Sequence, residues 1–215
     1  MANNQTIGRL IILSGPSGVG KGTICKELLK KDPRLALSVS ATTRQPGPGE
    51  IHGKDYFFCT PEAFQTIQDQ DGFLESAVVH GNRYGTLKAY VQEILNSGKD
   101  CILEIDVQGG LQVLHQLPDR CITIFVAPPS EEELLRRIRS RDRDKPESIA
   151  VRMKTAQWEM AQEDKYQHTV INDDLDIAVN KILQILQDAR QQEENRTPDS
   201  AVTGENDPWA VKEYK

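Results

Sequence analysis

Short apolar runs alternate with amphipathic stretches along most of the chain. Four runs predict buried strands: RLIIL at 9–13, CILEIDVQGG at 101–110, RCITIFVAPP at 120–129 and HTVIND at 168–173. Between them, apolar residues recur every three or four positions, which predicts helices at about 23–31, 87–96, 130–141 and 146–164. A last helix carries the stripe Ala178, Ile182, Ile185, Leu186 and Ala189. Strands that alternate with helices predict an α/β fold around a parallel sheet.

The segment from Ser38 to about 86 breaks this alternation. Its first part, up to Asp55, is rich in Pro, Gly and Thr, so we expect a long ordered loop or a small irregular insertion. Short strands are predicted at 56–58 and 73–79, on either side of a helix capped by Thr60 with Pro61 at its first position. We expect a domain at 1–193, with the insertion at about 38–86 and a lid at about 130–155. The polar segment 194–215 is expected to be a disordered tail.

Composition narrows the class of protein. A chain of 215 residues, 38% of them hydrophobic, is long enough to build one globular unit. The net charge of -6 argues against sequence-independent binding to a polyanion, so no nucleic-acid partner is expected. The four cysteines lack a CxxC pair, as suits a reducing compartment, and the histidines lack metal-ligand spacing. Because the sequence has neither a signal-peptide pattern nor a long apolar run, we expect a cytoplasmic protein without a membrane partner.

The stretch GPSGVGKGT follows the first predicted strand and precedes the first predicted helix, which is the context of a phosphate-binding loop. Glycines let backbone N–H groups turn toward phosphate oxygens, and Lys21 bridges the β and γ phosphates of a nucleotide. The usual pattern has Ser or Thr after the lysine, as a magnesium ligand; here that position is Gly22, so the phosphates and water are expected to hold the metal. An ordinary Gly-rich turn is the alternative. The residues predicted to bind ATP are Gly15, Pro16, Ser17, Gly18, Val19, Gly20, Lys21, Gly22 and Thr23.

Two acids follow the apolar run that begins at Cys101. Glu104 and Asp106 are expected on one face at the carboxyl end of this strand, the edge where ligands bind in open α/β sheets. An acid at this place can order magnesium or its waters. We therefore predict that Asp106 and Thr23 hold Mg2+, directly or through water. A solvated strand end is the alternative.

Five arginines crowd the segment RRIRSRDR at 136–143, and Arg152 follows on the next predicted helix. The flat guanidinium fork binds phosphate through two hydrogen bonds and offsets the charge of a transferring phosphoryl group. A lid that closes over a nucleotide needs only two or three of them. A solvated helix face, paired with the acids at 131–133, is the alternative and accounts for the others.

Taken together, the segments GPSGVGKGT, SVSATTR, GKDYFF, FLE with GNRYGT, ILEIDVQG, APPS and VINDD resemble the guanylate kinase family in order and spacing, from about Leu10 to Gln187. The resemblance implies an α/β fold with a phosphate-loop parallel sheet flanked by helices, a small insertion that binds GMP and a helical lid over ATP. It also implies transfer of the γ-phosphoryl group of ATP to GMP, giving ADP and GDP, with Mg2+. Since GMP already offers an anionic oxygen, we expect catalysis by alignment and charge neutralisation without a general base.

The same resemblance assigns roles to single residues. Those that look like the guanine readers are Ser40 and Glu75, with Thr86 and Glu104 assisting. Guanine presents N1–H and a 2-amino group side by side, and one carboxylate can accept hydrogen bonds from both. The family's clamp on the GMP phosphate matches Arg44, Tyr56 and Tyr84. Its arginines around the transferring group match Arg137, Arg141 and Arg152, and its adenine contact matches the segment of Asn172.

One position departs from the family. Guanylate kinases commonly carry a second phosphate-binding arginine three residues after the first, and that place is Gly47 in this chain. The loss is expected to weaken GMP binding or to shift the role to a neighbour such as Lys54.

Three other functions remain open at this point. Guanylate-kinase-like domains also serve as non-catalytic interaction modules, although those usually have a degraded phosphate loop. A kinase acting mainly on AMP or dGMP is a closer alternative, and dGMP is expected as a further substrate beside ATP and GMP. A GTP-hydrolysing switch is disfavoured because no NKxD-like motif is present. The chain is expected to be a monomer or a homodimer.

Overall fold

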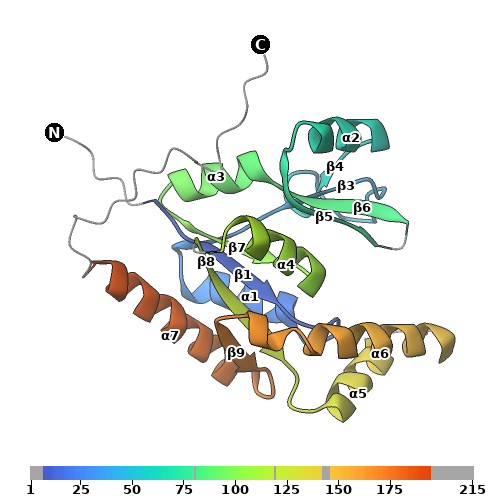
Figure 1. The fold of residues 1–215 in the computed structure, drawn as a ribbon, viewed down its shortest axis with the longest axis vertical. Helices are drawn as coiled ribbons and strands as arrows, with labels where there is room; N and C mark the ends of the chain where they lie inside the picture. The colour runs from blue at the N-terminus through green and yellow to red at the C-terminus, as the bar shows by residue number, and fades with distance from the viewer. Residues whose placement is uncertain (1–6, 80, 119, 142–145, 195–215) are drawn as a thin grey trace.

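A computed structural model describes residues 7–79, 81–118, 120–141 and 146–194, and the side chains within these ranges except those of 140–150 and 193–194. Its core is a five-stranded sheet in the order β2-β7-β1-β8-β9, in which every neighbouring pair is parallel (Figure 1). The strands are β1 (Leu10–Ser14), β2 (Leu35–Leu37), β7 (Asp100–Glu104), β8 (Cys121–Ala127) and β9 (His168–Ile171). The expectation of an α/β fold on a parallel sheet is confirmed.

Helices cover both faces of the core sheet because its strands are apolar on both sides. In β1, Leu10 and Ile12 join the cluster beneath α3 (Lys88–Asn96) and α4 (Val107–Gln116). Ile11 and Leu13 point the other way, into the cluster formed with α1 (Lys21–Lys31) and α7 (Leu175–Glu194). This two-sided burial explains the continuous apolar runs in the sequence.

The insertion forms its own small sheet, in the order β4-β3-β6-β5, which lies at one end of the core sheet (Figure 1). It contains β3 (Ser40–Thr42), β4 (Phe57–Phe58), α2 (Pro61–Asp69), β5 (Phe73–Val79) and β6 (Asn82–Leu87). The Thr60 cap of α2 is confirmed, since its hydroxyl accepts a hydrogen bond from Ala63 N at 3.2 Å. Phe64 stacks on Phe73 at a centroid distance of 4.4 Å, so the insertion has a core of its own.

The predicted lid at about 130–155 corresponds to α5 (Glu131–Arg141) and most of α6 (Pro146–Met160), whose last turn reaches the core, and the two helices pack through Leu134, Ile138 and Ala156. Ser130 caps α5 by accepting a hydrogen bond from Glu133 N at 3.1 Å. In a capping box, the Glu133 carboxylate would accept a hydrogen bond from the backbone of the capping residue. Here it accepts hydrogen bonds from Arg136 and Arg137 on the same helix instead. A short 3-10 turn, η1 (Glu163–Lys165), leads from α6 to β9.

A buried cluster of charged side chains connects the last helix to the edge of the core sheet where the amino ends of its parallel strands lie. Arg190 on α7 is 6% exposed, and its Nε and Nη2 donate to Asp100 Oδ2 at 2.8 and 2.5 Å. Its Nη1 donates to Asp32 Oδ2 at 2.5 Å, just beyond the end of α1. Burial pushes the pKa of Asp32 upward, but the hydrogen bonds from Arg190 and Arg34 outweigh it and lower that pKa. One guanidinium thus fixes three elements far from the phosphate loop.

Several sequence expectations are corrected by the structure. The irregular loop expected up to Asp55 contains β3, and strands β2 and β6 and helix α4 were not predicted at all. Asp106, expected at the end of a strand, is the N-cap of α4, and the helix predicted to reach about 164 ends at Met160. The tail was predicted to begin at 194, but Glu194 is the last residue of the last helix, and residues 195–215 lie outside the described residues. Among the helices that are described, none combines the length and the hydrophobicity needed to cross a membrane.

Candidate active site

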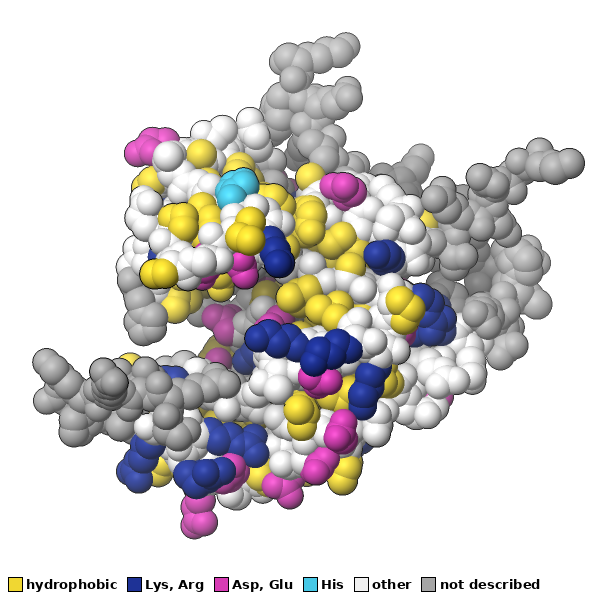
Figure 2. All heavy atoms as spheres, turned by 180° about the vertical axis from the view of Figure 1, so that it is seen from behind, with side chains coloured by type: hydrophobic (Ala, Val, Ile, Leu, Met, Phe, Trp, Pro, Cys, Tyr) yellow, Lys and Arg dark blue, Asp and Glu magenta, His cyan; other side chains and the backbone are white. Residues whose placement is uncertain are grey.

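The candidate site lies at the carboxyl edge of the core sheet, between the insertion and the lid. Figure 2 shows the molecule hollowed between these two parts, with acidic and basic side chains inside the hollow. The phosphate loop and the acids after β7 reach this edge from the core, because the carboxyl ends of parallel strands meet there. Every predicted site residue with a described side chain belongs to the core edge, the insertion or the lid.

The phosphate loop has the backbone conformation that its glycines predict. Gly15, Gly18 and Gly20 have φ values of 140°, 88° and 103°, a region that favours glycine. A Cβ atom at Gly15 would lie 2.2 Å from Val126 O, and one at Gly20 would lie 2.6 Å from Asn172 Nδ2. The helix α1 begins directly after Gly20, which caps it without a side chain. Its first N–H groups therefore remain available to an anion.

Lys21 folds back over the loop, and three carboxylates lie close enough for their charges to act on it. Its Nζ donates to Gly15 O at 2.5 Å and to Pro16 O at 3.4 Å. Burial lowers the pKa of Lys21, while the negative charges of Glu159, Glu104 and Asp106 act in the opposite direction. The site thus contains one ammonium group and three carboxylates, so its charge is negative in sum. Bound phosphates would add to this negative charge, and a cation bound with them would reduce it.

Glu104, the last residue of β7, and Asp106, two residues farther along, lie in different surroundings. A Cβ atom at Gly22 would lie 3.2 Å from Glu104 Oε1, so Glu104 stands against the position where the usual loop has a hydroxyl residue. Asp106 Oδ1 accepts a hydrogen bond from Gly109 N at 2.7 Å and caps α4. The negative charge of Asp106 raises the pKa of Glu75, whereas Glu104 is not among the groups that shift it. A Cβ atom at Gly109 would lie 2.9 Å from Glu75 Oε2 and 3.4 Å from Asp106 Oδ1, so Asp106 lies next to the predicted guanine reader.

Magnesium fits this donor set only as a partner of the nucleotide. In the described part of the chain, no three acidic, histidine or cysteine side chains form a group that could hold a metal by themselves. Mg2+ usually takes one or two carboxylates and completes its shell with phosphates and water. Glu104 and Asp106, both close enough to act on Lys21, meet that requirement. Thr23 lines a pocket on the other side of the loop, and its predicted role as a metal ligand stays a prediction.

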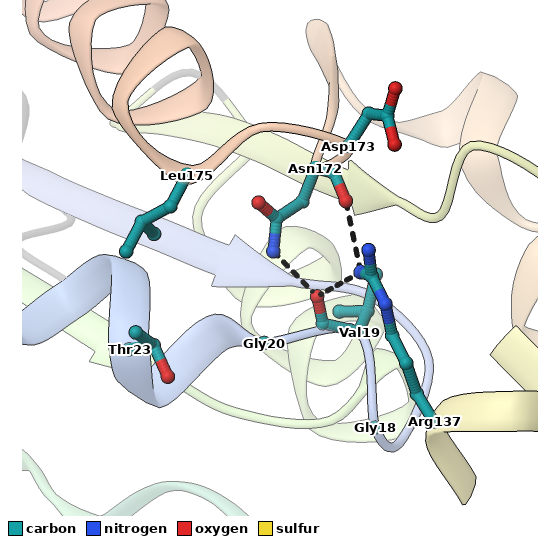
Figure 3. A pocket seen from close by; sticks show the side chains of 8 residues that line it. All are labelled: Gly18, Val19, Gly20, Thr23, Arg137, Asn172, Asp173 and Leu175. Carbon is teal, nitrogen blue, oxygen red and sulfur yellow. Dashed lines mark hydrogen bonds between the residues drawn. The ribbon is translucent and has the colours of Figure 1, made fainter. Parts of the chain in front are cut away.

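That pocket joins the phosphate loop, the lid and the segment after β9 (Figure 3). Asn172 Nδ2 donates to Val19 O at 2.8 Å, and Arg137 Nη1 donates to Asn172 O at 2.9 Å. The Asp173 carboxylate points away from these hydrogen bonds (Figure 3). The structure thus brings together the predicted adenine contact and one predicted lid arginine. The lining residues are Gly18, Val19, Gly20, Thr23, Arg137, Asn172, Asp173 and Leu175.

A second lid arginine reaches the loop from α6. Arg152 Nη2 lies 3.4 Å from Ser17 Oγ, which is within hydrogen-bonding distance. The side chain of Arg141, the third predicted lid arginine, lies outside the described residues. The lid therefore contacts the phosphate loop through both α5 and α6.

Three predicted guanine readers form one row across the insertion. Ser40 on β3 pairs with Thr86 on β6, and Thr86 pairs with Glu75 on β5. Residues directly opposite in antiparallel strands share a face of the sheet. Thr86 Oγ1 donates to Glu75 Oε1 at 2.6 Å, and Glu75 is only 7% exposed. Burial raises the pKa of Glu75, Thr86 opposes that shift through its hydrogen bond, and the charge of Asp106 adds to it.

The predicted phosphate clamp lies farther along the insertion, where Tyr84 is two residues from Thr86 on β6. Arg44 donates to both oxygens of Glu50, at 2.9 and 2.7 Å, and its guanidinium lies 5.3 Å from the ring centroid of Tyr56. Tyr56 and Tyr84 meet edge to face at 5.9 Å, so the three predicted clamp residues do come together. Gly47 N donates to Glu50 Oε2 at 2.6 Å, which places the departing position beside the clamp.

Two further site residues were missed from the sequence. Glu50 forms an ion pair with Arg44 and thereby holds it in place. The opposite charges of these two residues within the expected loop could have suggested this pair. Glu159 on α6 accepts a hydrogen bond from Ser17 N at 3.3 Å and is 5% exposed. In the sequence, Glu159 is one of several polar residues of a predicted helix. The spacing of apolar residues there does not distinguish it from a glutamate on the surface.

The sequence and the fold of this chain are similar to those of known proteins. The family model described as guanylate kinase matches residues 7–189. A guanylate kinase of Caldanaerobacter subterraneus is 50% identical over 179 residues, covering 83% of this chain and 86% of the relative. One of Rhodopirellula baltica is 51% identical over 187 residues, covering 86% and 90%. A crystal structure of guanylate kinase from Anaplasma phagocytophilum has a TM-score of 0.68 at 29% identity and covers 89% of each chain.

Proposed function

The chain belongs to the guanylate kinase family, and we propose that it transfers the γ-phosphoryl group of ATP to GMP, giving ADP and GDP, at the site described above. The observation that carries the choice of acceptor is the buried carboxylate of Glu75, held by Thr86 within the row that includes Ser40. A buried carboxylate at neutral pH needs donors, and guanine supplies two adjacent ones.

The phosphate loop takes the triphosphate of ATP. Its backbone N–H groups and the N-terminus of α1 bind phosphate oxygens, and Lys21 moves from the loop carbonyls to the β and γ phosphates. The pocket beside Asn172 takes the adenine, next to Arg137. Glu104 and Asp106 would hold Mg2+, which when bound with ATP neutralises phosphate charge.

The insertion takes GMP. Glu75 accepts hydrogen bonds from guanine N1–H and the 2-amino group, and Ser40 can donate to O6. Because Asp106 and Glu75 both lie next to Gly109 and the charge of Asp106 acts on Glu75, we propose that Asp106 assists guanine binding in place of Glu104. Arg44, Tyr56 and Tyr84 bind the GMP phosphate.

The reaction needs no general base, because the attacking oxygen of GMP is already anionic near neutral pH. The chain's own residues align the two phosphates and neutralise them, with Lys21 at the loop and Arg137 and Arg152 from the lid. Closure of insertion and lid excludes water, which would otherwise turn transfer into hydrolysis.

The proposal assigns the regions of the chain as follows. Residues 1–193 form the kinase domain, about 38–86 the GMP-binding insertion and about 130–155 the lid. The non-catalytic alternative is not favoured, because the loop glycines, Lys21 and the lid contacts are intact. Use of dGMP, a monomeric or dimeric state and a cytoplasmic location stay predictions.

The test is an ADP-release assay with ATP and magnesium, in which GMP, dGMP, AMP, CMP and UMP are offered in parallel beside a control without acceptor. We expect turnover with GMP to exceed that with AMP, CMP and UMP by at least two orders of magnitude, since a site built for hydrogen bonds rejects partners that lack them. Turnover that does not depend on the acceptor would overturn the proposal.

A further inference from the structure

The lid helix α6 contacts the phosphate loop at Ser17 through two oppositely charged residues. Arg152 Nη2 lies 3.4 Å from the Ser17 hydroxyl, and Glu159 Oε2 accepts a hydrogen bond from Ser17 N at 3.3 Å. Arg152 and Glu159 are seven residues apart, so they lie about two turns apart on the same side of the helix. Ser17 is therefore contacted from both sides by this helix: by Arg152 from the part nearer the tip of the lid, and by Glu159 from the part nearer the core.

Glu159 is buried, and its charge is used within the site. It is 5% exposed, and besides Ser17 N it accepts a hydrogen bond from the backbone of Val107, the first residue of α4. Among the carboxylates that raise the pKa of Lys21, Glu159 has the largest effect. Burial raises the pKa of Glu159, while the positive charge of Lys21 and the two backbone donors lower it. A lone buried carboxylate would be costly, so its surroundings have to compensate it.

We propose that Glu159 is a positioning residue for phosphoryl transfer, which anchors the base of the lid to Ser17 and holds Lys21 in register with the loop. Glu104 and Asp106 are at the carboxyl end of β7, where the nucleotide's metal is expected, whereas Glu159 comes from the lid side. It is the only carboxylate of the three around Lys21 that is carried by a lid helix. This inference rests on the proposed function, because it concerns the kinase reaction of the same site.

The physical reason lies in what Glu159 connects. Lys21 has to leave Gly15 O when phosphates arrive, and Arg152 has to approach the transferring group. Glu159 sets the position of α6 relative to the loop by its hydrogen bond to Ser17, and it opposes drift of the ammonium by its charge. Loss of the charge should misplace Lys21 by a fraction of an ångström, which affects a transition state more than it affects binding.

The test compares Glu159→Gln with wild type in the full chain. Glutamine keeps the size and one acceptor oxygen, which can serve Ser17 N, but removes the charge and the second acceptor oxygen. We expect kcat to fall at least tenfold, with KM for GMP within twofold and KM for ATP unchanged or lower, because one negative charge near the triphosphate is gone. Calorimetric titration with ADP should still show about one site per chain, which separates misplacement from unfolding. Glu159→Asp, which keeps the charge, should recover part of the lost kcat.

The matched control is Glu132→Gln, which removes an exposed charge from the lid helix α5. A kcat for Glu159→Gln within twofold of wild type would overturn the inference, as would a loss of ADP sites equal to the loss of kcat. If wild type itself showed no GMP-dependent turnover, the proposed function would fail, and that result is distinguishable from both outcomes.

Discussion

Replacing Glu75 by Gln should separate the two substrates of the enzyme. The wild-type carboxylate is 7% exposed and uses one oxygen to accept from Thr86. A carboxylate has about four acceptor positions, so guanine N1–H and the 2-amino group still find acceptors. Glutamine has one oxygen, which Thr86 already occupies, and its amino group would face the donors of guanine.

The expected magnitude follows from the lost hydrogen bonds. Hydrogen bonds to a charged group contribute about 1.5–3 kcal/mol each, so loss of two corresponds to about 3–6 kcal/mol. At about 1.4 kcal/mol for each factor of ten, kcat/KM for GMP should fall by roughly 10² to 10⁴. KM for ATP should stay within about twofold, because Glu75 contacts the insertion and α4 but not the phosphate loop.

Steady-state kinetics with one substrate varied at a time measures this separation, and Glu93→Gln, an exposed change of the same charge on α3, is the control. The reasoning is refuted if KM for GMP changes less than threefold, or if both substrates lose affinity equally. The same variant should be as stable as wild type or more stable at pH 7. Because the folded-state pKa of Glu75 is raised, its ionised form opposes folding at neutral pH, and this cost disappears as pH falls through the raised pKa.

Three further outcomes are expected. Lys21→Met should lower kcat by about 10²–10³-fold with little change in KM for GMP, measured by initial rates; near-normal turnover would remove Lys21 from the mechanism. Gly47→Arg should lower KM for GMP about tenfold, because a second guanidinium would reach the clamp once Glu50, 3.1 Å from the new Cβ atom, shifts slightly; an unchanged or higher KM contradicts this. Arg190→Met should destabilise the fold by about 3–5 kcal/mol in denaturant unfolding, since two buried aspartates lose their partner, while both KM values stay unchanged; a loss below 1 kcal/mol would argue against the ion cluster.

The pH dependence of GMP use offers an independent check on Glu75. Its pKa is raised by burial, so protonation begins at a higher pH than for an ordinary glutamate and removes the acceptor that guanine needs. KM for GMP should therefore rise as pH falls, and the rise should be smaller in Glu75→Gln. The phosphate of GMP also titrates, but equally for both proteins, so the difference between the two curves isolates Glu75.

The elements that could be predicted most accurately from the sequence are those specified by a strong signal within a few neighbouring residues. The phosphate loop, the Thr60 cap and the long apolar strands were predicted in place, because glycine spacing, capping chemistry and two-sided burial act within a few residues. The short strand at 35–37 and the strand at 82–87 were missed. Their stability comes from partners distant in the sequence, which no local pattern records.

The site was predicted in part for the same reason. Ser40, Thr86 and Glu75 form a row only because β3, β6 and β5 are neighbours, and the family resemblance supplied them where periodicity could not. The helix α4 was missed because its two glycines, which have low helix propensity, hid its start. Those glycines are required by packing: a Cβ atom would lie 2.9 Å from Glu75 Oε2 at Gly109 and 2.4 Å from the Tyr166 hydroxyl at Gly110.

At the proposed site, the connection from β7 into α4 serves both nucleotides, and this would constrain how the protein can evolve. Glu104 stands against the start of α1, Asp106 acts on both Lys21 and Glu75, and Gly109 leaves room for Glu75. We therefore expect mutations in this stretch that alter acceptor preference to disturb the donor side as well. A lineage that acquires a new acceptor should therefore keep residues 104–110 and change the strands of the insertion. Exchange of 38–86 between relatives would be the shortest route to a kinase of altered specificity.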